Sequence, residues 1–154
     1  MKEIRGNYNG KGKRIGIVVS RFNEMVSGRL LEGCIDELKK QGVEDKDITV
    51  FWTPGSFEIP QVLAKLCDNK KYDAFISLGA VIRGDTPHFD YIAAESTKGI
   101  ANLSLSKGIP IILGVLTCDS VDQALERAGT KQGNKGRDAA RNAVEMTNLY
   151  KQIL

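Results

Sequence analysis

The chain has 154 residues, of which 22 are basic and 19 acidic, and its net charge is +3. This length fits one domain that buries about two-thirds of its unfolded surface, so the fold needs neither a metal nor a disulfide. The basic residues are scattered, which argues against nucleic acid as a partner and favours local anion sites for a small phosphorylated substrate. The apolar runs are far shorter than a membrane span. We expect a single domain over 1–154, with an irregular arm at 1–13 and no membrane contact.

Three cysteines, Cys34, Cys67 and Cys118, occur without CxxC or Cys/His spacing, and each lies in or beside an apolar pattern. An odd number of such cysteines predicts reduced thiols in a reducing compartment. We therefore expect a cytoplasmic protein without a metal site.

Strand-like and helix-like segments alternate from residue 14 to the carboxyl end. Short runs rich in Val and Ile predict strands, and apolar residues at helical spacing predict helices between them. The expected strands are 14–20, 48–53, 74–82 and 109–118, and the expected helices are 25–41, 57–69, 92–107, a short one after Ser120, and one from about Lys135 to the end. This alternation is typical of a three-layer α/β/α sandwich, in which helices cover both faces of a parallel sheet.

Local signals predict several helix ends. Gly42 follows the helix 25–41 and stops it, and Pro60 suits the first turn of the helix 57–69. Ser120 and Gln123 have the S-x-x-Q form of a capping box, which opens a further helix.

The only histidine, His88, comes shortly after the expected strand 74–82. Ligands of open α/β proteins bind outside the carboxyl ends of parallel strands, so His88 lies where such proteins build active sites. A histidine can move protons in both directions near neutral pH, which makes His88 a candidate general acid and base. The alternative is that this lone histidine is a capping or surface residue.

Two other strand ends carry candidate binding residues. Phe22 and Asn23 offer an aromatic face beside an amide, which could stack on and hydrogen-bond a planar heterocycle, although Phe22 could equally be a core residue at a strand end. Ser56, Phe57 and Glu58 open a helix whose backbone N–H groups suit an anion or a carbonyl oxygen, with plain capping as the alternative.

Two segments could hold a phosphate. Gly84, Asp85 and Thr86 offer backbone N–H groups and a hydroxyl, although the loop lacks the GxxxxGK[ST] form and Asp85 must face away from a dianion. Arg127 and Lys135 flank a short polar turn, and from composition alone they indicate a solvated basic patch.

Taken together and in this order, these segments resemble the 6,7-dimethyl-8-ribityllumazine synthase family over nearly the whole chain. The residues that carry the resemblance are RFN at 21–23, PGSFEIP at 54–60, GAVIRGDTPHFDY at 79–91, GVLT at 114–117, RAG at 127–129 and GNKG at 133–136. The third segment is highly specific by itself.

The resemblance implies a flavodoxin-like fold and a transferase of riboflavin biosynthesis. The implied reaction joins 5-amino-6-(D-ribitylamino)uracil to (S)-3,4-dihydroxy-2-butanone 4-phosphate and releases phosphate and water, with no metal or organic cofactor. It also implies roles for particular residues. His88 is the general acid and base, Phe22 and Asn23 contact the uracil, and the backbone of Ala80, Val81 and Ile82 contacts its edge. The ribityl chain is held by Ser56, Phe57 and Glu58. The phosphate is bound by Gly84, Asp85 and Thr86 together with Arg127 of a neighbouring subunit, and Lys135 makes a weaker contact.

One position departs from the family pattern. Leu113 stands before the GVLT run, where the family usually has an aromatic residue. The resemblance then implies that one wall of the uracil pocket is aliphatic and that stacking depends mainly on Phe22.

Members of the family form pentamers with active sites between subunits, and some close into shells of sixty. The short turn 129–134 is similar to that of the shell-forming members, so we expect a homo-oligomer of twelve pentamers, with a single pentamer as the alternative and riboflavin synthase as a possible partner.

Two other functions are alternatives to the implied one. The first is an archaeal-type riboflavin synthase, which the GDTPHFDY segment disfavours. The second is a flavin-binding or shell-forming module without turnover. A flavodoxin-like redox or signalling protein lacks support, because no hydroxyl-rich phosphate loop follows the first strand.

Overall fold

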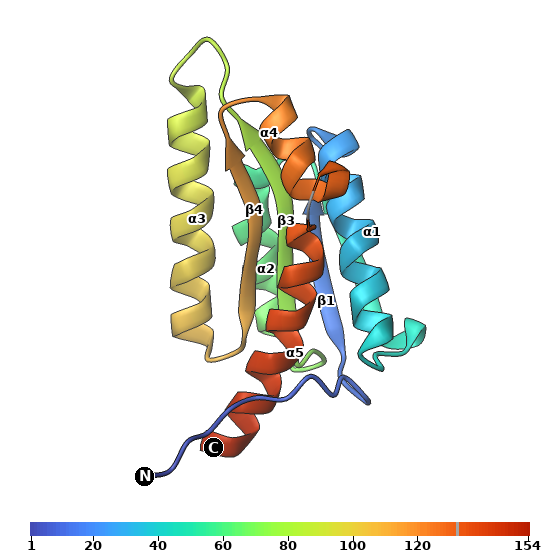
Figure 1. The fold of residues 1–154 in the computed structure, drawn as a ribbon. Coiled ribbons are helices and arrows are strands. Elements are labelled where there is room, and N and C mark those ends of the chain that lie inside the picture. Colours follow the sequence, from blue (N-terminus) through green and yellow to red (C-terminus); the bar gives the residue numbers. More distant parts are fainter. Residues whose placement is uncertain (132) are drawn as a thin grey trace.

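The computed structural model describes residues 1–131 and 133–154, which contain a four-stranded parallel sheet (Figure 1). The strands are β1 (Ile15–Ser20), β2 (Ile48–Thr53), β3 (Ala74–Ile82) and β4 (Ile111–Cys118), in the spatial order β2-β1-β3-β4. The register places Val19 beside Leu78 and Leu78 beside Gly114. The predicted parallel α/β fold is confirmed.

Helices cover both faces of this sheet. One face carries α1 (Glu24–Lys40), α4 (Val121–Leu125), the irregular turn η3 (Glu126–Thr130) and α5 (Lys135–Ile153), and the other carries α2 (Ile59–Cys67) and α3 (His88–Lys107). Two single 3₁₀ turns, η1 (Asp45–Asp47) and η2 (Ser56–Glu58), lie on either side of β2. Both termini lie at the end of the molecule opposite the β3–α3 loop (Figure 1).

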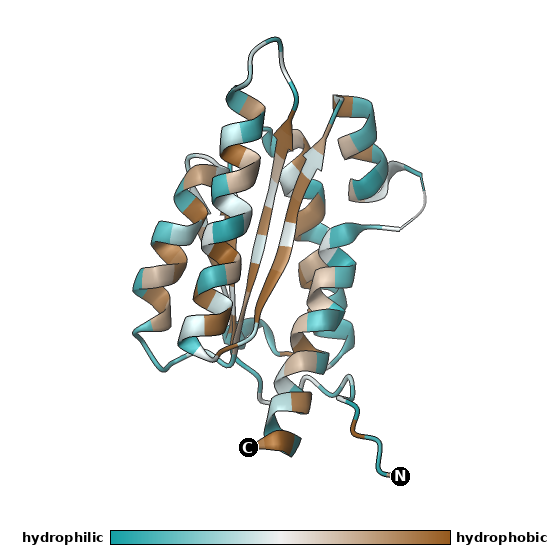
Figure 2. Cartoon of the chain, turned by 90° about the vertical axis from the view of Figure 1, so that its left-hand side faces the viewer, coloured by the Kyte–Doolittle hydropathy of each residue, from teal (hydrophilic) through white to brown (hydrophobic). Residues whose placement is uncertain are grey.

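The two central strands, β1 and β3, are buried along almost their whole length. Figure 2 shows hydrophobic residues along the strands between the helical layers. Strands of parallel sheets are buried on both faces, so their side chains alternate between two apolar layers. In β1, Ile17 and Val19 contribute to the core under α1 and α5, whereas Val18 contributes to the core under α2 and α3. The alternation along the strand therefore decides which side chains pack against each helical layer.

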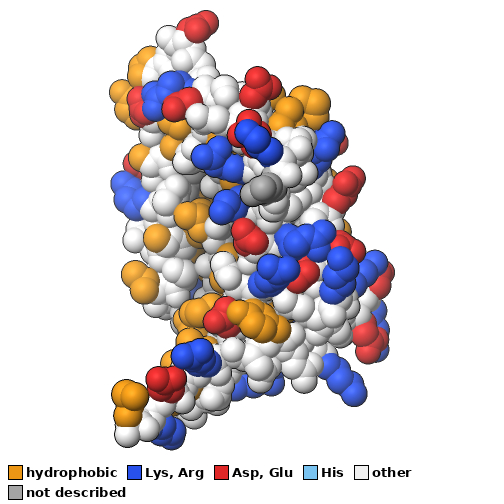
Figure 3. Space-filling model, in the orientation of Figure 1, with side chains coloured by type: hydrophobic (Ala, Val, Ile, Leu, Met, Phe, Trp, Pro, Cys, Tyr) orange, Lys and Arg blue, Asp and Glu red, His pale blue; other side chains and the backbone are white. Residues whose placement is uncertain are grey.

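A polar contact and a close approach join α1 to α5. Glu37 is buried on α1 and accepts hydrogen bonds from Arg141 Nε at 2.8 Å and Arg137 Nη1 at 3.4 Å. A Cβ on Gly136 would overlap the carbonyl group of Leu30, so glycine is required where the two helices meet. Basic and acidic side chains are interspersed over the face shown in Figure 3.

The observed boundaries differ from the predicted ones mainly at helix starts. The strands 48–53 and 74–82 are confirmed, but β4 begins at Ile111 because Pro110 has no N–H to donate to a neighbouring strand. Helix α3 begins at His88 rather than at 92, and the predicted helix 57–69 begins as the 3₁₀ turn η2 and ends at Cys67.

The remaining strand and helix boundaries shift by one residue. β1 begins at Ile15 and α1 covers Glu24–Lys40. The Ser120 cap of the predicted capping box is confirmed, since Gln123 N donates to Ser120 Oγ at 3.1 Å. The return contact differs by one residue, because Gln123 Oε1 accepts from the backbone N–H of Asp119 rather than from that of Ser120.

The three cysteines are free thiols, and burial raises the pKa of Cys34 to about 12. Within residues 1–131 and 133–154, no cluster of three or more His, Cys, Asp or Glu side chains could hold a metal ion. None of the helices in this part of the chain is both long and apolar enough to cross a membrane.

Candidate functional site

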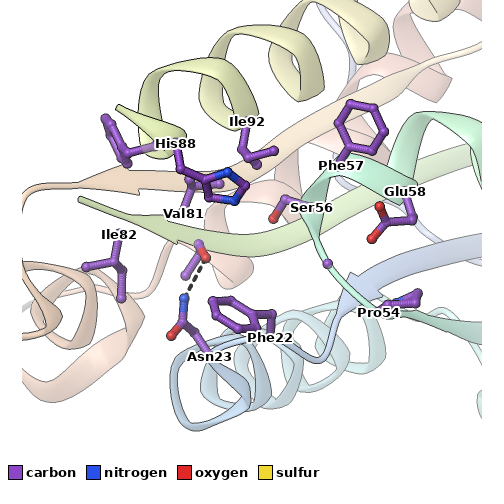
Figure 4. A pocket seen from close by; sticks show the side chains of 13 residues that line it. Phe22, Asn23, Pro54, Ser56, Phe57, Glu58, Val81, Ile82, His88 and Ile92 are labelled. Atoms are coloured by element: carbon purple, nitrogen blue, oxygen red, sulfur yellow. Dashed lines mark hydrogen bonds between the residues drawn. The ribbon is translucent and has the colours of Figure 1, made fainter. Parts of the chain in front are cut away.

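A pocket of about 440 Å³ opens at the carboxyl ends of β1 and β3 (Figure 4). The chain runs from β1 to β2 in one direction and then crosses to β3 on the other side of β1, so this is the point where the strand order reverses. Such points are the usual ligand sites of open α/β sheets. The lining residues are Phe22, Asn23, Pro54, Gly55, Ser56, Phe57, Glu58, Ala80, Val81, Ile82, His88, Phe89 and Ile92.

Phe22 and Asn23 form the turn between β1 and α1. Asn23 adopts left-handed backbone dihedrals, with φ at 61°, which asparagine tolerates better than most residues. Its Nδ2 donates to the carbonyl oxygen of Ala80 at 3.0 Å, and the backbone N–H of Phe22 donates to the carbonyl oxygen of Pro54 at 3.1 Å. These bonds tie the turn to both neighbouring strand ends. Phe22 is 70% exposed, which excludes the core alternative within one chain.

Ser56, Phe57 and Glu58 make up the 3₁₀ turn η2 on the opposite side of the pocket. Ser56 is 6% exposed and Phe57 is 48% exposed, so the hydroxyl lies deep in the pocket while the ring lies at its rim. Figure 4 shows the Ser56 side chain between Phe22 and His88. This side of the pocket therefore offers a hydroxyl, a carboxylate and an aromatic ring to one ligand.

His88 is the first residue of α3, and its imidazole lines the pocket near Val81 and Ile92 (Figure 4). Its backbone N–H donates to Thr86 Oγ1 at 3.5 Å. Phe89 and Ile92 also line the pocket. Helical periodicity places Ile92 on the same face as His88, about one turn later. The imidazole is exposed and can meet a bound ligand without rearrangement of the core.

Arg83 holds the start of α3 against the end of β4. Its Nε donates to Asp119 Oδ1 at 3.0 Å, its Nη1 lies 3.5 Å from Asp90 Oδ1, and its guanidinium lies 4.4 Å from the centre of the Phe89 ring. The hydrogen bond to Asp119 raises the pKa of Arg83. These contacts fix the helix turn that carries His88.

The loop residues Gly84, Asp85 and Thr86 are exposed and lie beside the pocket rather than in its lining. A Cβ on Gly84 would meet no atom within 4 Å, so the loop is open to solvent on that side.

Leu113, Arg127 and Lys135 lie elsewhere on the chain. They line a second cavity of about 430 Å³ along β4, together with parts of α5, and this cavity shares no lining residue with the first pocket. Leu113 is half-exposed there, and Arg127 Nη1 donates to the carbonyl oxygen of Gln123 at 3.3 Å. Apart from the loop 84–86, the predicted site residues therefore form two separate groups within one chain. The edge group is Leu113, Arg127 and Lys135. The pocket group consists of the predicted residues that line the first pocket: Phe22, Asn23, Ser56, Phe57, Glu58, Ala80, Val81, Ile82 and His88.

Sequence reasoning did not select Pro54, Gly55, Phe89 and Ile92 as lining residues. Pro54 and Gly55 directly follow β2, and strand ends are a usable signal for such residues. Phe89 and Ile92 depend on α3 beginning at His88, which the sequence pattern placed later.

The comparison with protein families agrees with this geometry. The family model described as 6,7-dimethyl-8-ribityllumazine synthase matches residues 12–151, which is nearly the whole chain and includes both the pocket group and the edge group. On this match, the chain belongs to the 6,7-dimethyl-8-ribityllumazine synthase family, the transferases that make this lumazine in riboflavin biosynthesis.

Proposed function

We propose that the protein condenses 5-amino-6-(D-ribitylamino)uracil with (S)-3,4-dihydroxy-2-butanone 4-phosphate to 6,7-dimethyl-8-ribityllumazine, the penultimate step of riboflavin biosynthesis. The observation that carries the proposal is the pocket at the ends of β1 and β3, which combines an exposed aromatic ring, a buried hydroxyl and an imidazole. Family membership over residues 12–151 supports it.

In this proposal the pyrimidine ring stacks on Phe22, beside Asn23. Ser56, Phe57 and Glu58 hold the ribityl chain, and the backbone of residues 80–82 contacts the edge of the ring. The carbonyl oxygen of Ala80 already accepts from Asn23. The contacts to the ring edge therefore come mainly from the other backbone groups of Val81 and Ile82.

His88 moves the protons of the reaction. The 5-amino group attacks the ketone carbon, and His88 returns a proton to the oxygen, which leaves as water and gives an imine. Removal of the proton at C3 sends an electron pair towards C4, and phosphate leaves from C4 with its bonding pair. The resulting enol becomes a methyl ketone, the ribitylamino nitrogen attacks it, and loss of a second water closes the ring.

The phosphate lies at Gly84, Asp85 and Thr86, with the Asp85 carboxylate turned away. Arg127 of a neighbouring subunit supplies the positive charge, Lys135 of that subunit makes a weaker contact, and its Leu113 forms one wall of the heterocycle site. Support for a shared site comes from the separation of the pocket group and the edge group within one chain. A second copy can bring the two groups together.

The proposal extends to a ring of five subunits. A heterologous contact, in which the edge group of one copy meets the pocket of the next, closes into a ring when the rotation allows it. Twelve such pentamers make a shell of sixty subunits, with a single pentamer as the alternative. We place the assembly in the cytoplasm, with riboflavin synthase as a candidate partner.

The experiment that tests this function is product fluorescence after the purified protein is mixed with both substrates. We expect lumazine to form faster than in the same mixture without protein, where the substrates react spontaneously. A rate equal to the spontaneous one would overturn the proposal and leave a binding or shell-forming protein with an inherited pocket.

A further inference from the structure

Two serine hydroxyls, those of Ser20 and Ser56, lie close to Gly79, next to the pocket. Ser20 is the last residue of β1, is fully buried, and its Oγ has no hydrogen-bond partner. A Cβ on Gly79 would lie 2.6 Å from Ser20 Oγ and 2.8 Å from Ser56 Oγ. Because glycine has no Cβ, position 79 leaves a small space that both hydroxyl oxygens border.

An unpartnered buried hydroxyl is costly, because the group has lost its water and gained no bond in return. Thr53, the partner of Ser20 across β1 and β2, donates its own hydroxyl to the carbonyl oxygen of Gly55 at 2.9 Å. Alanine at position 20 would fill the same strand position without the unsatisfied group. Ser20 therefore does not serve the stability of the unliganded protein.

We infer that Ser20 is a positioning residue that acts through Ser56 when a polyhydroxy chain occupies the pocket. Ser20 Oγ then donates to Ser56 Oγ, and Ser56 keeps its own proton for a ligand oxygen. A hydroxyl has one proton and two lone pairs, so this arrangement satisfies both serines at once, and each bond polarises the next. The inference relies on the proposed function for the nature of the ligand, a heterocycle with a ribityl chain.

The test compares the affinities of two probes by fluorescence titration, 6,7-dimethyl-8-ribityllumazine and 6,7-dimethyllumazine, which lacks the ribityl chain. We expect Ser20→Ala to weaken binding of the ribityl compound roughly 3- to 10-fold, the value of one neutral hydrogen bond. Binding of 6,7-dimethyllumazine should not change. The thermal unfolding midpoint should stay the same or rise, which a merely structural residue would not produce.

A double-mutant cycle separates action through Ser56 from direct action. Because Ser20 acts through Ser56, Ser20→Ala should have no further effect in a Ser56→Ala background. Gly79→Ala should also weaken the ribityl compound, since its Cβ pushes the two hydroxyls apart. The matched control is Ser27→Ala on α1, which removes another buried unpartnered hydroxyl that does not line the pocket and should leave both affinities unchanged.

Equal loss for both probes, additive losses in the cycle, or an unchanged affinity in Ser20→Ala would overturn the inference while leaving the proposed function intact. A wild-type protein that does not prefer the ribityl compound would instead contradict the proposed function, and the inference with it.

Discussion

Asn23 Nδ2 donates a hydrogen bond to the carbonyl oxygen of Ala80 across a distance of 3.0 Å. This bond joins the turn after β1 to the end of β3, and so it holds Phe22 beside the strand that leads to His88. Asparagine therefore has two roles at position 23: it donates this hydrogen bond, and it tolerates the left-handed backbone dihedrals of the turn.

Asn23→Asp isolates the hydrogen bond, because aspartate tolerates the same backbone conformation but offers no donor to the Ala80 carbonyl. Two oxygens would then face each other, and we expect a loss of about 1–3 kcal/mol in the free energy of unfolding. We also expect weaker binding of the lumazine product, because Phe22 loses its support. Denaturant unfolding and fluorescence titration measure the two effects, and unchanged values in both would show that the bond does not hold the turn.

His88→Ala should slow turnover without abolishing it. A positioned acid and base contributes roughly 10²- to 10⁴-fold, whereas holding two reactants together contributes separately through effective molarity. We expect kcat to fall by roughly 10²-fold, the lower end of that range. Steady-state kinetics of the variant beside the wild type provide the measurement. A variant that matched the wild-type kcat would remove His88 from the mechanism.

Leu113→Phe should strengthen binding of the heterocycle if the edge group completes the site. A stacked aromatic pair contributes about 0.5–1.5 kcal/mol beyond simple burial, so the dissociation constant for the lumazine product should fall roughly 2- to 10-fold. Titration of the variant against wild type gives this value. An unchanged constant would mean that Leu113 does not line the occupied site.

Glu37 should make stability depend on pH in the acid range. Burial alone would raise the pKa of Glu37, but hydrogen bonds from Arg141 and Arg137 and their charges hold it below its usual value. A carboxylate with a lowered pKa stabilises the fold above its unfolded pKa, and this stability is lost as pH falls through the folded pKa. The loss should therefore appear below about pH 4.3, the usual value for glutamate.

Glu37→Gln tests this ion pair. We expect the variant to lose about 1.5–3 kcal/mol of unfolding free energy at pH 7, the value of a hydrogen bond to a charged group, and to show a shallower decline of stability between pH 5 and 3. Glu44→Gln is the control, because Glu44 pairs with Lys46 at an exposed site and should change stability by less than about 0.5 kcal/mol. Equal pH slopes for wild type and Glu37→Gln would contradict the assignment.

The sequence predicted the sheet well because its strands have clear ends. Pro54 and Gly55 close β2, and Arg83 and Gly84 close β3, so the apolar runs between such signals match the observed strands. The predicted helix 92–107 starts four residues too late, because α3 begins at His88, directly after Pro87. A proline is compatible with a helix start, so the pattern alone did not decide the boundary.

Most of the pocket group could be predicted because its members follow strands, and the carboxyl ends of parallel strands lie at one edge of the sheet. Ala80, Val81 and Ile82 lie within β3, and only the family resemblance indicated them. The separation of Arg127 and Lys135 from His88 within one chain could not be predicted in this way. It depends on how α5 and η3 pack across β4, which involves contacts between residues far apart in the sequence. The lack of a hydrogen-bond partner for the Ser20 hydroxyl could not be predicted from the sequence either, because the identity of a serine at a strand end does not indicate its partners.

In the proposed assembly, each catalytic site combines the pocket of one chain with the edge group of another. Co-assembly of His88→Ala with Arg127→Ala, after both are dissociated and mixed in equal amounts, tests this arrangement directly. Random mixing around a ring gives about a quarter of the sites an intact pocket facing an intact edge group, so activity should recover to roughly a quarter of the wild-type value. A mixture no more active than the mean of the two variants alone would show that the two groups do not act together between chains.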